Sequence, residues 1–314
     1  MSNFFTWAFI LPLLQATIRM ATPYTLAAIG GIYSDKAGVS SIELEGILLM
    51  GAFTGFATVY YTNSLWLAVL VAMLSGVLLV GIYAFMVVML GCKSALIGTA
   101  IVLLASGLTN FYYRSIFGVS SEYTSIIPFK NFTVPILGHI PVIGKIFFQQ
   151  NALVYISFIL VFATWYFFEK TALGLECRSV GENPFAADTL GLPVVRLRMI
   201  NVLITGSIAA IAGAYLSIAT SSSFVENMSA EKGYAAFAII ILGRYSPIGA
   251  FLGCLLYGFA DALQLNLQAI GINVPYQFML MMPYIFTLIV MFIAGKGEKP
   301  EGHSKFFKKG LQIT

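Results

Sequence analysis

The sequence predicts an all-α fold, a polytopic bundle of transmembrane helices. Hydrophobic residues make up 59% of the 314 residues and charged residues only 10%, whereas soluble domains are roughly 45–50% apolar and about 25% charged. The 26 Phe, 16 Tyr and 12 Met leave too little polar surface to cover a water-soluble protein of this size. We therefore expect one transmembrane permease domain over residues 1–314, with about eight to ten membrane segments.

The membrane segments are found by cutting the chain at its charged residues. A bilayer core about 30 Å thick needs about 20 apolar residues per helix, and a charge at its centre costs at least about 2.5 kcal/mol. Seven clear spans result: Gly46–Thr62, Leu65–Leu90, Ser94–Tyr113, Asn151–Phe168, Asn201–Thr220, Ile248–Leu265 and Tyr276–Ala294.

Two further apolar stretches are harder to interpret. Residues Phe4–Tyr33 form either one long helix or two short ones. We favour two helices broken around Arg19 and Pro23, because proline interrupts a helix and lipid disfavours a charge. Residues Gly233–Leu242 are too few for an upright span, so we expect a half-helix or re-entrant segment there.

Basic residues set the expected orientation, because Lys and Arg in short loops are retained on the cytoplasmic side during insertion. They concentrate in a loop over about residues 169–199 and in the tail over residues 295–314. We expect both regions, and hence the C-terminus, in the cytoplasm, with an even number of crossings between them. The segment Arg114–Gln150 then lies outside, where its prolines and aromatics suit an ordered cap or interfacial hairpin.

The loop Ser179–Pro193 contains the pattern of a short helix. Asn183 can cap the helix, Pro184 suits its first turn, and Gly191 followed by Pro193 ends it after about two turns. A helix shorter than about 12 to 15 residues is marginal by itself. We therefore expect it to dock on another surface, although an ordinary loop between helices remains an alternative.

The same loop resembles a known family. Ala186, Ala187 and Gly191 are similar to the Ala-Ala-x3-Gly core by which bacterial ABC importer permeases contact their ATPase subunits, although Phe185 stands where the older pattern has Glu. The run Val180–Asp188 resembles the version found in the branched-chain amino acid, simple sugar and nucleoside permease family. The runs Ala21–Gly55 and Gly243–Gln264 resemble that family's first and late helices.

The resemblance implies a permease of the type II-like ABC importers, a transport subunit without enzymatic activity or cofactor. ATP and Mg²⁺ would bind to a partner ATPase subunit. A second homologous permease, forming a heterodimer, and an external substrate-binding lipoprotein would complete the complex in the bacterial plasma membrane. The residues expected to couple this chain to the ATPase are Gly181, Glu182, Asn183, Pro184, Ala186, Ala187, Asp188 and Gly191.

The transported solute is also inferred from resemblance. The regions Ser34–Glu45 and Phe259–Gln264 look most like those of purine nucleoside importers that work with a basic-membrane-lipoprotein type of receptor. Importers for riboflavin and for simple sugars such as ribose are close relatives and remain alternatives.

A few polar residues in the spans could line the substrate path. Asp261 is the only acid inside a clear span, and Gln264 shares its helix face. Both could hydrogen-bond a polar solute, but Asp261 could equally cap a neighbouring helix or meet water at the interface. Asn110, Phe111 and Tyr112 could stack on and bond a base, although aromatics at span ends usually belong to the interfacial belt.

Other sites are not expected. The nearest approach to the nucleotide motif G-x-x-x-x-G-K-[ST], residues 138–146, has one residue too many and no hydroxyl. The three cysteines are widely spaced without C-x-x-C, which predicts neither a disulfide nor a metal site. A net charge of only +4, without a basic stripe, argues against nucleic acid.

Two rival functions remain open on the sequence. An ion-coupled secondary transporter or channel would explain the helices, but such carriers usually bury polar or acidic clusters at mid-membrane. A membrane scaffold would leave the loop resemblance unexplained. The repeats Gly51-x3-Gly55 and Gly249-x3-Gly253 place small residues on one helix face, where close helix packing is favoured over a gating role.

Overall fold

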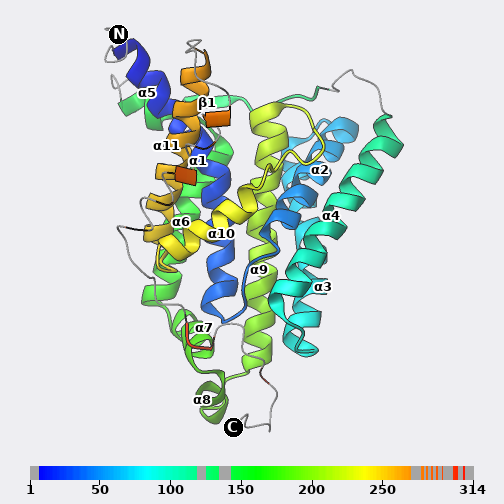
Figure 1. Cartoon of the computed structure of the whole chain (residues 1–314), viewed down its shortest axis with the longest axis vertical. Helices are drawn as coiled ribbons and strands as arrows, with labels where there is room; N and C mark the ends of the chain where they lie inside the picture. The colour runs from blue at the N-terminus through cyan, green and yellow to red at the C-terminus, as the bar shows by residue number, and fades with distance from the viewer. Residues whose placement is uncertain are drawn as a thin grey trace.

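Helices make up nearly all the regular structure in the computed structural model (Figure 1). The structure describes residues 7–118, 125–133 and 143–269, and beyond these only isolated positions between 277 and 307. The elements are α1 (Trp7–Lys36), α2 (Leu44–Thr62), α3 (Leu65–Ala84), the π-helical η1 (Phe85–Met89), α4 (Ser94–Phe117), β1 (Asn131–Thr133), α5 (Ile143–Phe147), β2 (Gln149–Asn151), α6 (Ala152–Lys170), α7 (Ala172–Glu182), α8 (Pro184–Thr189), α9 (Val194–Tyr215), the π-helical η3 (Leu216–Ser221), α10 (Lys232–Leu242) and α11 (Pro247–Ala269).

The polytopic helical bundle expected from the sequence is confirmed. Within the described residues, six helices are long and apolar enough to cross a membrane: α2, α3 with η1, α4, α6, α9 with η3, and α11. They correspond to six of the seven clear spans. The seventh, Tyr276–Ala294, lies outside the described residues apart from isolated positions.

The N-terminal stretch is one continuous helix, so the expected break around Arg19 and Pro23 is wrong. Proline has no N–H to bond the carbonyl four residues earlier, which here is that of Arg19. The hydroxyl of Tyr215, on α9, donates to that oxygen at 3.2 Å. The Arg19 side chain is also satisfied, because its Nε donates to Oε1 of Gln150 at 3.2 Å. Contacts distant in sequence therefore keep α1 whole.

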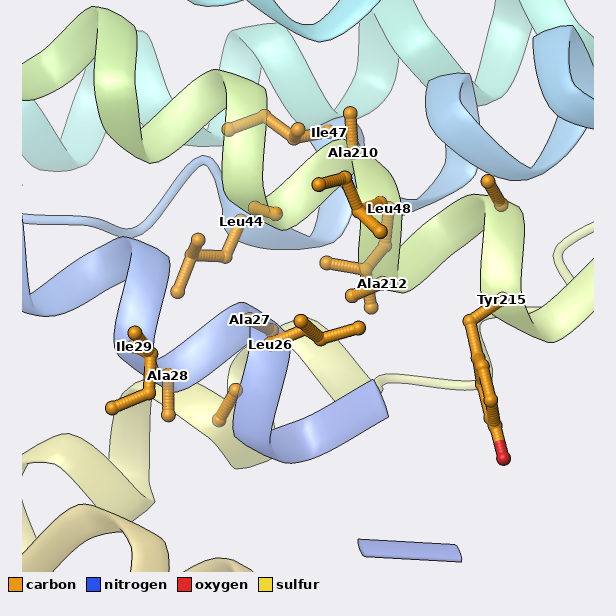
Figure 2. Close-up of a cluster of buried hydrophobic side chains, with 14 of the residues drawn as sticks. Leu26, Ala27, Ala28, Ile29, Leu44, Ile47, Leu48, Ala210, Ala212 and Tyr215 are labelled. Atoms are coloured by element: carbon orange, nitrogen blue, oxygen red, sulfur yellow. The ribbon is translucent and has the colours of Figure 1, made fainter. Parts of the chain in front are cut away.

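Helix α9 lies at the centre of the bundle, between α1, α2 and α3. Its span is 78% buried, against 33% for the spans of α3, α4 and α6. Small residues allow this approach: a Cβ on Gly213 would lie 2.1 Å from the Leu48 carbonyl oxygen, and one on Gly51 would lie 2.3 Å from that of Ala210. Figure 2 shows the resulting core, where α1, α2 and α9 meet. The packing interpretation of Gly51-x3-Gly55 is confirmed.

The two ends of the bundle differ (Figure 1). One end carries the N-terminal part of α1, helix α5 and a small antiparallel sheet in which β1 pairs with β2. This sheet departs from the all-α expectation. The ordered cap or interfacial hairpin expected outside the membrane over Arg114–Gln150 stays a prediction. The other end carries α7 and α8 together with the tail, since the Gly302 N–H donates to the Gly181 carbonyl at 3.0 Å. The loop over residues 169–199 thus meets the described part of the tail at one end.

Helix α10 is the short segment expected over Gly233–Leu242. With 11 residues it is too short to span a bilayer upright. It lies obliquely at mid-height in Figure 1 and packs against α1, α2 and α11. A half-helix therefore lies in the middle of the bundle.

Candidate functional site

A pocket of about 220 Å³ lies between α1, α10 and α11. Its polar and aromatic lining includes Tyr24, Glu231, Lys232, Tyr257, Asp261 and Gln264. We call it the α10 pocket. The prediction that Asp261 and Gln264 share one face is confirmed, because both line this pocket. Their contact with a substrate remains a prediction.

Asp261 is held by a residue of α1. The Tyr24 hydroxyl donates to Oδ2 of Asp261 at 2.7 Å. The Tyr24 ring lies against that of Tyr257, with ring centroids 4.9 Å apart. Close approach of the two helices permits this, because a Cβ on Gly258 would lie 2.5 Å from the Ala21 nitrogen. Asp261 therefore bonds a side chain across the pocket wall and, among the described residues, no helix N–H is seen to donate to it.

The α10 pocket is lined by both acidic and basic side chains. Asp261 and Glu231 are acidic, and Lys232 is the base beside them. The Lys232 ammonium lies over the Tyr24 ring, 5.8 Å from its centroid. Since the acids outnumber the base among the described lining residues, the pocket suits a neutral or cationic solute better than a phosphate or carboxylate.

The second predicted group of path residues lies elsewhere. Asn110, Phe111 and Tyr112 are on α4, across the bundle from α11 in Figure 1. Phe111 and Tyr112 are largely exposed, and the Tyr112 ring stacks on that of Phe53 at 6.5 Å. The structure does not bring them to Asp261, so their role stays a prediction.

Sequence reasoning missed Tyr24, Tyr257 and Lys232 as pocket residues. Tyr24 lies next to Pro23, where we expected the helix to break, and aromatic residues are too frequent in this sequence to stand out. Lys232 flanks the half-helix, and that position was the one visible indication.

Helices α7 and α8, with the turn to Gly191, form what we call the platform, at the C-terminal end of α1. The predicted short helix is confirmed in detail: the Asn183 side chain accepts from the Ala186 N–H at 3.1 Å, and Pro184 follows it. Gly191 has φ +82°, the left-handed conformation that favours glycine after a helix. Helix α7, capped by Thr171, was not expected.

The platform is held by this chain's own residues. Val180, Ala187, Val194 and Phe307 form a small buried cluster, and the Phe307 ring lies 5.3 Å from that of Phe185. Cys177 lies on the buried face of α7, and this burial raises the pKa of its thiol. The short α8 therefore has packing partners within this chain. Its docking on another subunit stays a prediction.

The predicted coupling residues divide into buried and exposed sets. Gly181, Pro184 and Ala187 face inward, Asp188 is half-buried, and Glu182, Asn183, Ala186 and Gly191 are exposed. Ala187 is only 1% exposed. A bulky charged residue at Ala187 should therefore disturb the buried cluster of Val180, Ala187, Val194 and Phe307. A side chain at Gly191 would meet open space but a strained backbone.

Leu190 is an exposed apolar residue that sequence reasoning missed. It is 79% exposed at the end of α8. A leucine between a threonine and a glycine in a polar loop was the available indication. Together with Ala186 it gives the platform a small apolar tip.

Comparison with known proteins extends these observations. Residues 13–295 match the family described as the permease component of branched-chain amino acid transport systems. The guanosine ABC transporter permease protein NupQ of Bacillus subtilis is 35% identical over 95% of this chain and 97% of its own length. The nucleoside ABC transporter permease protein NupC of Lactococcus lactis is 35% identical over 90% and 92%. A putative glucose ABC transporter permease protein of Haloferax volcanii, TsgC13, is 34% identical over 90% and 92%.

Proposed function

The chain belongs to the family of permease components of branched-chain amino acid transport systems, and from this premise we propose that it is the membrane-spanning subunit of an ATP-driven nucleoside importer. It is a multi-pass membrane protein and a transport component. Names of relatives suggest the solute, and the α10 pocket supports it.

The lining of the α10 pocket supports a nucleoside as the solute, because it combines the Asp261 carboxylate with tyrosine rings. A nucleobase has an apolar face that stacks on aromatic side chains. Its edge carries N–H donors that a carboxylate such as that of Asp261 can accept. A nucleoside has no phosphate, which fits a pocket with more acidic than basic lining residues among those described.

A sugar is the second candidate solute. The Haloferax volcanii relative is named for glucose, and tyrosine rings with Asp261 and Gln264 could also bind sugar hydroxyls. Riboflavin remains a third alternative from the sequence resemblance. The tyrosine rings favour a solute with a flat aromatic face.

Energy would enter through the platform. We propose that Ala186 and Leu190 dock on a separate ATPase subunit in the cytoplasm, which places the C-terminus there as well. Closure of two ATPases would move the platform and switch access of the pocket between the two sides. A second, related permease and an external lipoprotein receptor would complete the transporter.

Uptake measurements test the solute. Cells that lack this chain should lose uptake of labelled guanosine and regain it when the chain is restored. Unlabelled guanosine in excess should compete, whereas glucose and riboflavin should not. Restored uptake of glucose without uptake of guanosine would replace the nucleoside assignment with the sugar one.

A further inference from the structure

We infer that Glu45 is a positioning residue for transport, because its carboxylate fixes the turn that forms one wall of the α10 pocket. The inference rests on the proposed function in taking this pocket as the transport site. Glu45 is in the first turn of α2 and does not line the pocket itself.

The Glu45 carboxylate binds three donors in residues 229–233, which we call the 229–233 turn. Oε1 accepts from the Ser229 hydroxyl and, at 3.1 Å, from the Glu231 N–H. Oε2 accepts from the Gly233 N–H at 2.7 Å. Both Glu45 and Ser229 are buried. A buried carboxylate with this many donors is strongly fixed in place.

The 229–233 turn has a conformation that needs such support. Ala230 and Glu231 have φ of +46° and +62°, which side chains other than glycine and asparagine rarely adopt. Gly233 has no room for a side chain, because a Cβ would lie 2.4 Å from the Glu45 Cα. Backbone strain of this kind persists only where the surroundings impose it. Glu45 provides that constraint.

The same turn forms part of the α10 pocket. Ala230, Glu231 and Lys232 all line it, and Lys232 lies over the Tyr24 ring that bonds Asp261. A displacement of the turn would therefore move both charged groups on this wall relative to Asp261.

Glu45 also occupies the N-terminus of α10. Helix N-terminal N–H groups attract anions, and half-helices inside transporters often present them to anionic substrates. Here a carboxylate of the chain itself accepts the Gly233 N–H. The N-terminus of α10 is therefore occupied by a side chain of the protein and does not serve an anionic substrate. This agrees with a neutral solute in the pocket.

The test uses the complete transporter, purified with its partner subunits and reconstituted in liposomes. The measured quantity is guanosine taken up per ATP hydrolysed, from which the amount of protein cancels. Glu45→Gln should lower this ratio about tenfold, as expected for loss of one charge-assisted hydrogen bond, while ATP hydrolysis changes less than about twofold. Ser229→Ala, which keeps the carboxylate and its two backbone donors, should lower it about threefold.

Glu226→Gln is the matched control. Glu226 precedes the turn and forms an exposed ion pair with Arg114, so the ratio should stay unchanged. An unchanged ratio in Glu45→Gln would overturn the inference. If that variant does not assemble, an unchanged ratio in Ser229→Ala overturns it. Failure of the unmodified transporter to take up guanosine refutes the proposed function instead, and the same ratio measured with glucose then tests Glu45.

Discussion

The α10 pocket and the platform are built in opposite ways. The pocket draws its side chains from three helices distant in sequence, with Tyr24 on α1, Lys232 on α10 and Asp261 on α11. The platform is a nearly continuous stretch, residues 172–191, held down by the tail. A contiguous segment can be recognised from a motif, whereas a pocket assembled from distant residues cannot. The two regions should also fail differently when altered.

The largest expected effect is at the platform tip. Leu190→Asp should reduce uptake by about 100-fold or more, because an unpaired carboxylate would be buried in the proposed ATPase contact. The ATPase should no longer co-purify with the chain. Leu190→Met keeps the apolar volume and serves as control, with uptake near the original value. Normal co-purification in Leu190→Asp would contradict the proposed docking.

A smaller loss of uptake, without loss of ATPase binding, is expected from a substitution in the pocket. Asp261→Asn should lower guanosine uptake about tenfold, since a hydrogen bond to a charged group is worth about 1.5–3 kcal/mol. Co-purification of the ATPase should be unaffected. Tyr24→Phe removes only the donor to Asp261 and should have a milder effect. Loss of the ATPase in Asp261→Asn would show that the two regions are not separable.

The tail provides a third, intermediate test. Phe307→Ala removes the ring that packs on Phe185 and completes the buried cluster beneath α8. We expect roughly a fivefold loss of uptake, with faster proteolytic cleavage between α7 and α9, because the loosened helix is marginal alone. Uptake and cleavage identical to those of the unmodified chain would show that α8 is held by other contacts.

The smallest effect on uptake is expected outside both regions. Complete burial of Glu43, in the connection between α1 and α2, raises the pKa of its carboxyl well above the usual value. The folded chain then binds this proton more tightly than the unfolded one, so stability falls as the pH rises above about 4.5. Glu43→Gln should remove that loss, raise Tm in detergent at pH 7 and leave uptake unchanged. A lower Tm at pH 7 would mean that the ionised form is stabilising.

How much the sequence predicted depends on the range of the interactions. The spans follow from local hydropathy and α8 from local capping by Asn183, and both were predictable. The single α1 helix depends on Tyr215, the burial of Ala187 on Phe307, and the position of Asp261 on Tyr24. Each of these partners lies more than 100 residues away in the sequence, where no periodicity or spacing connects them. The role of Glu45 was invisible for the same reason.

The continuity of α1 links the two regions mechanically. Tyr24 stands in the pocket wall, and near the C-terminal end of the same helix the Lys36 carbonyl lies so close to Gly181 that a Cβ there would be 2.0 Å away. At 1.5 Å of rise per residue, these positions are separated by about 18 Å of unbroken helix. Because this helix is continuous, a movement at its C-terminal end next to the platform should also move Tyr24 in the pocket wall. The Tyr215 hydroxyl donates to the Arg19 carbonyl that Pro23 leaves unbonded, and so supports α1 immediately N-terminal to this segment.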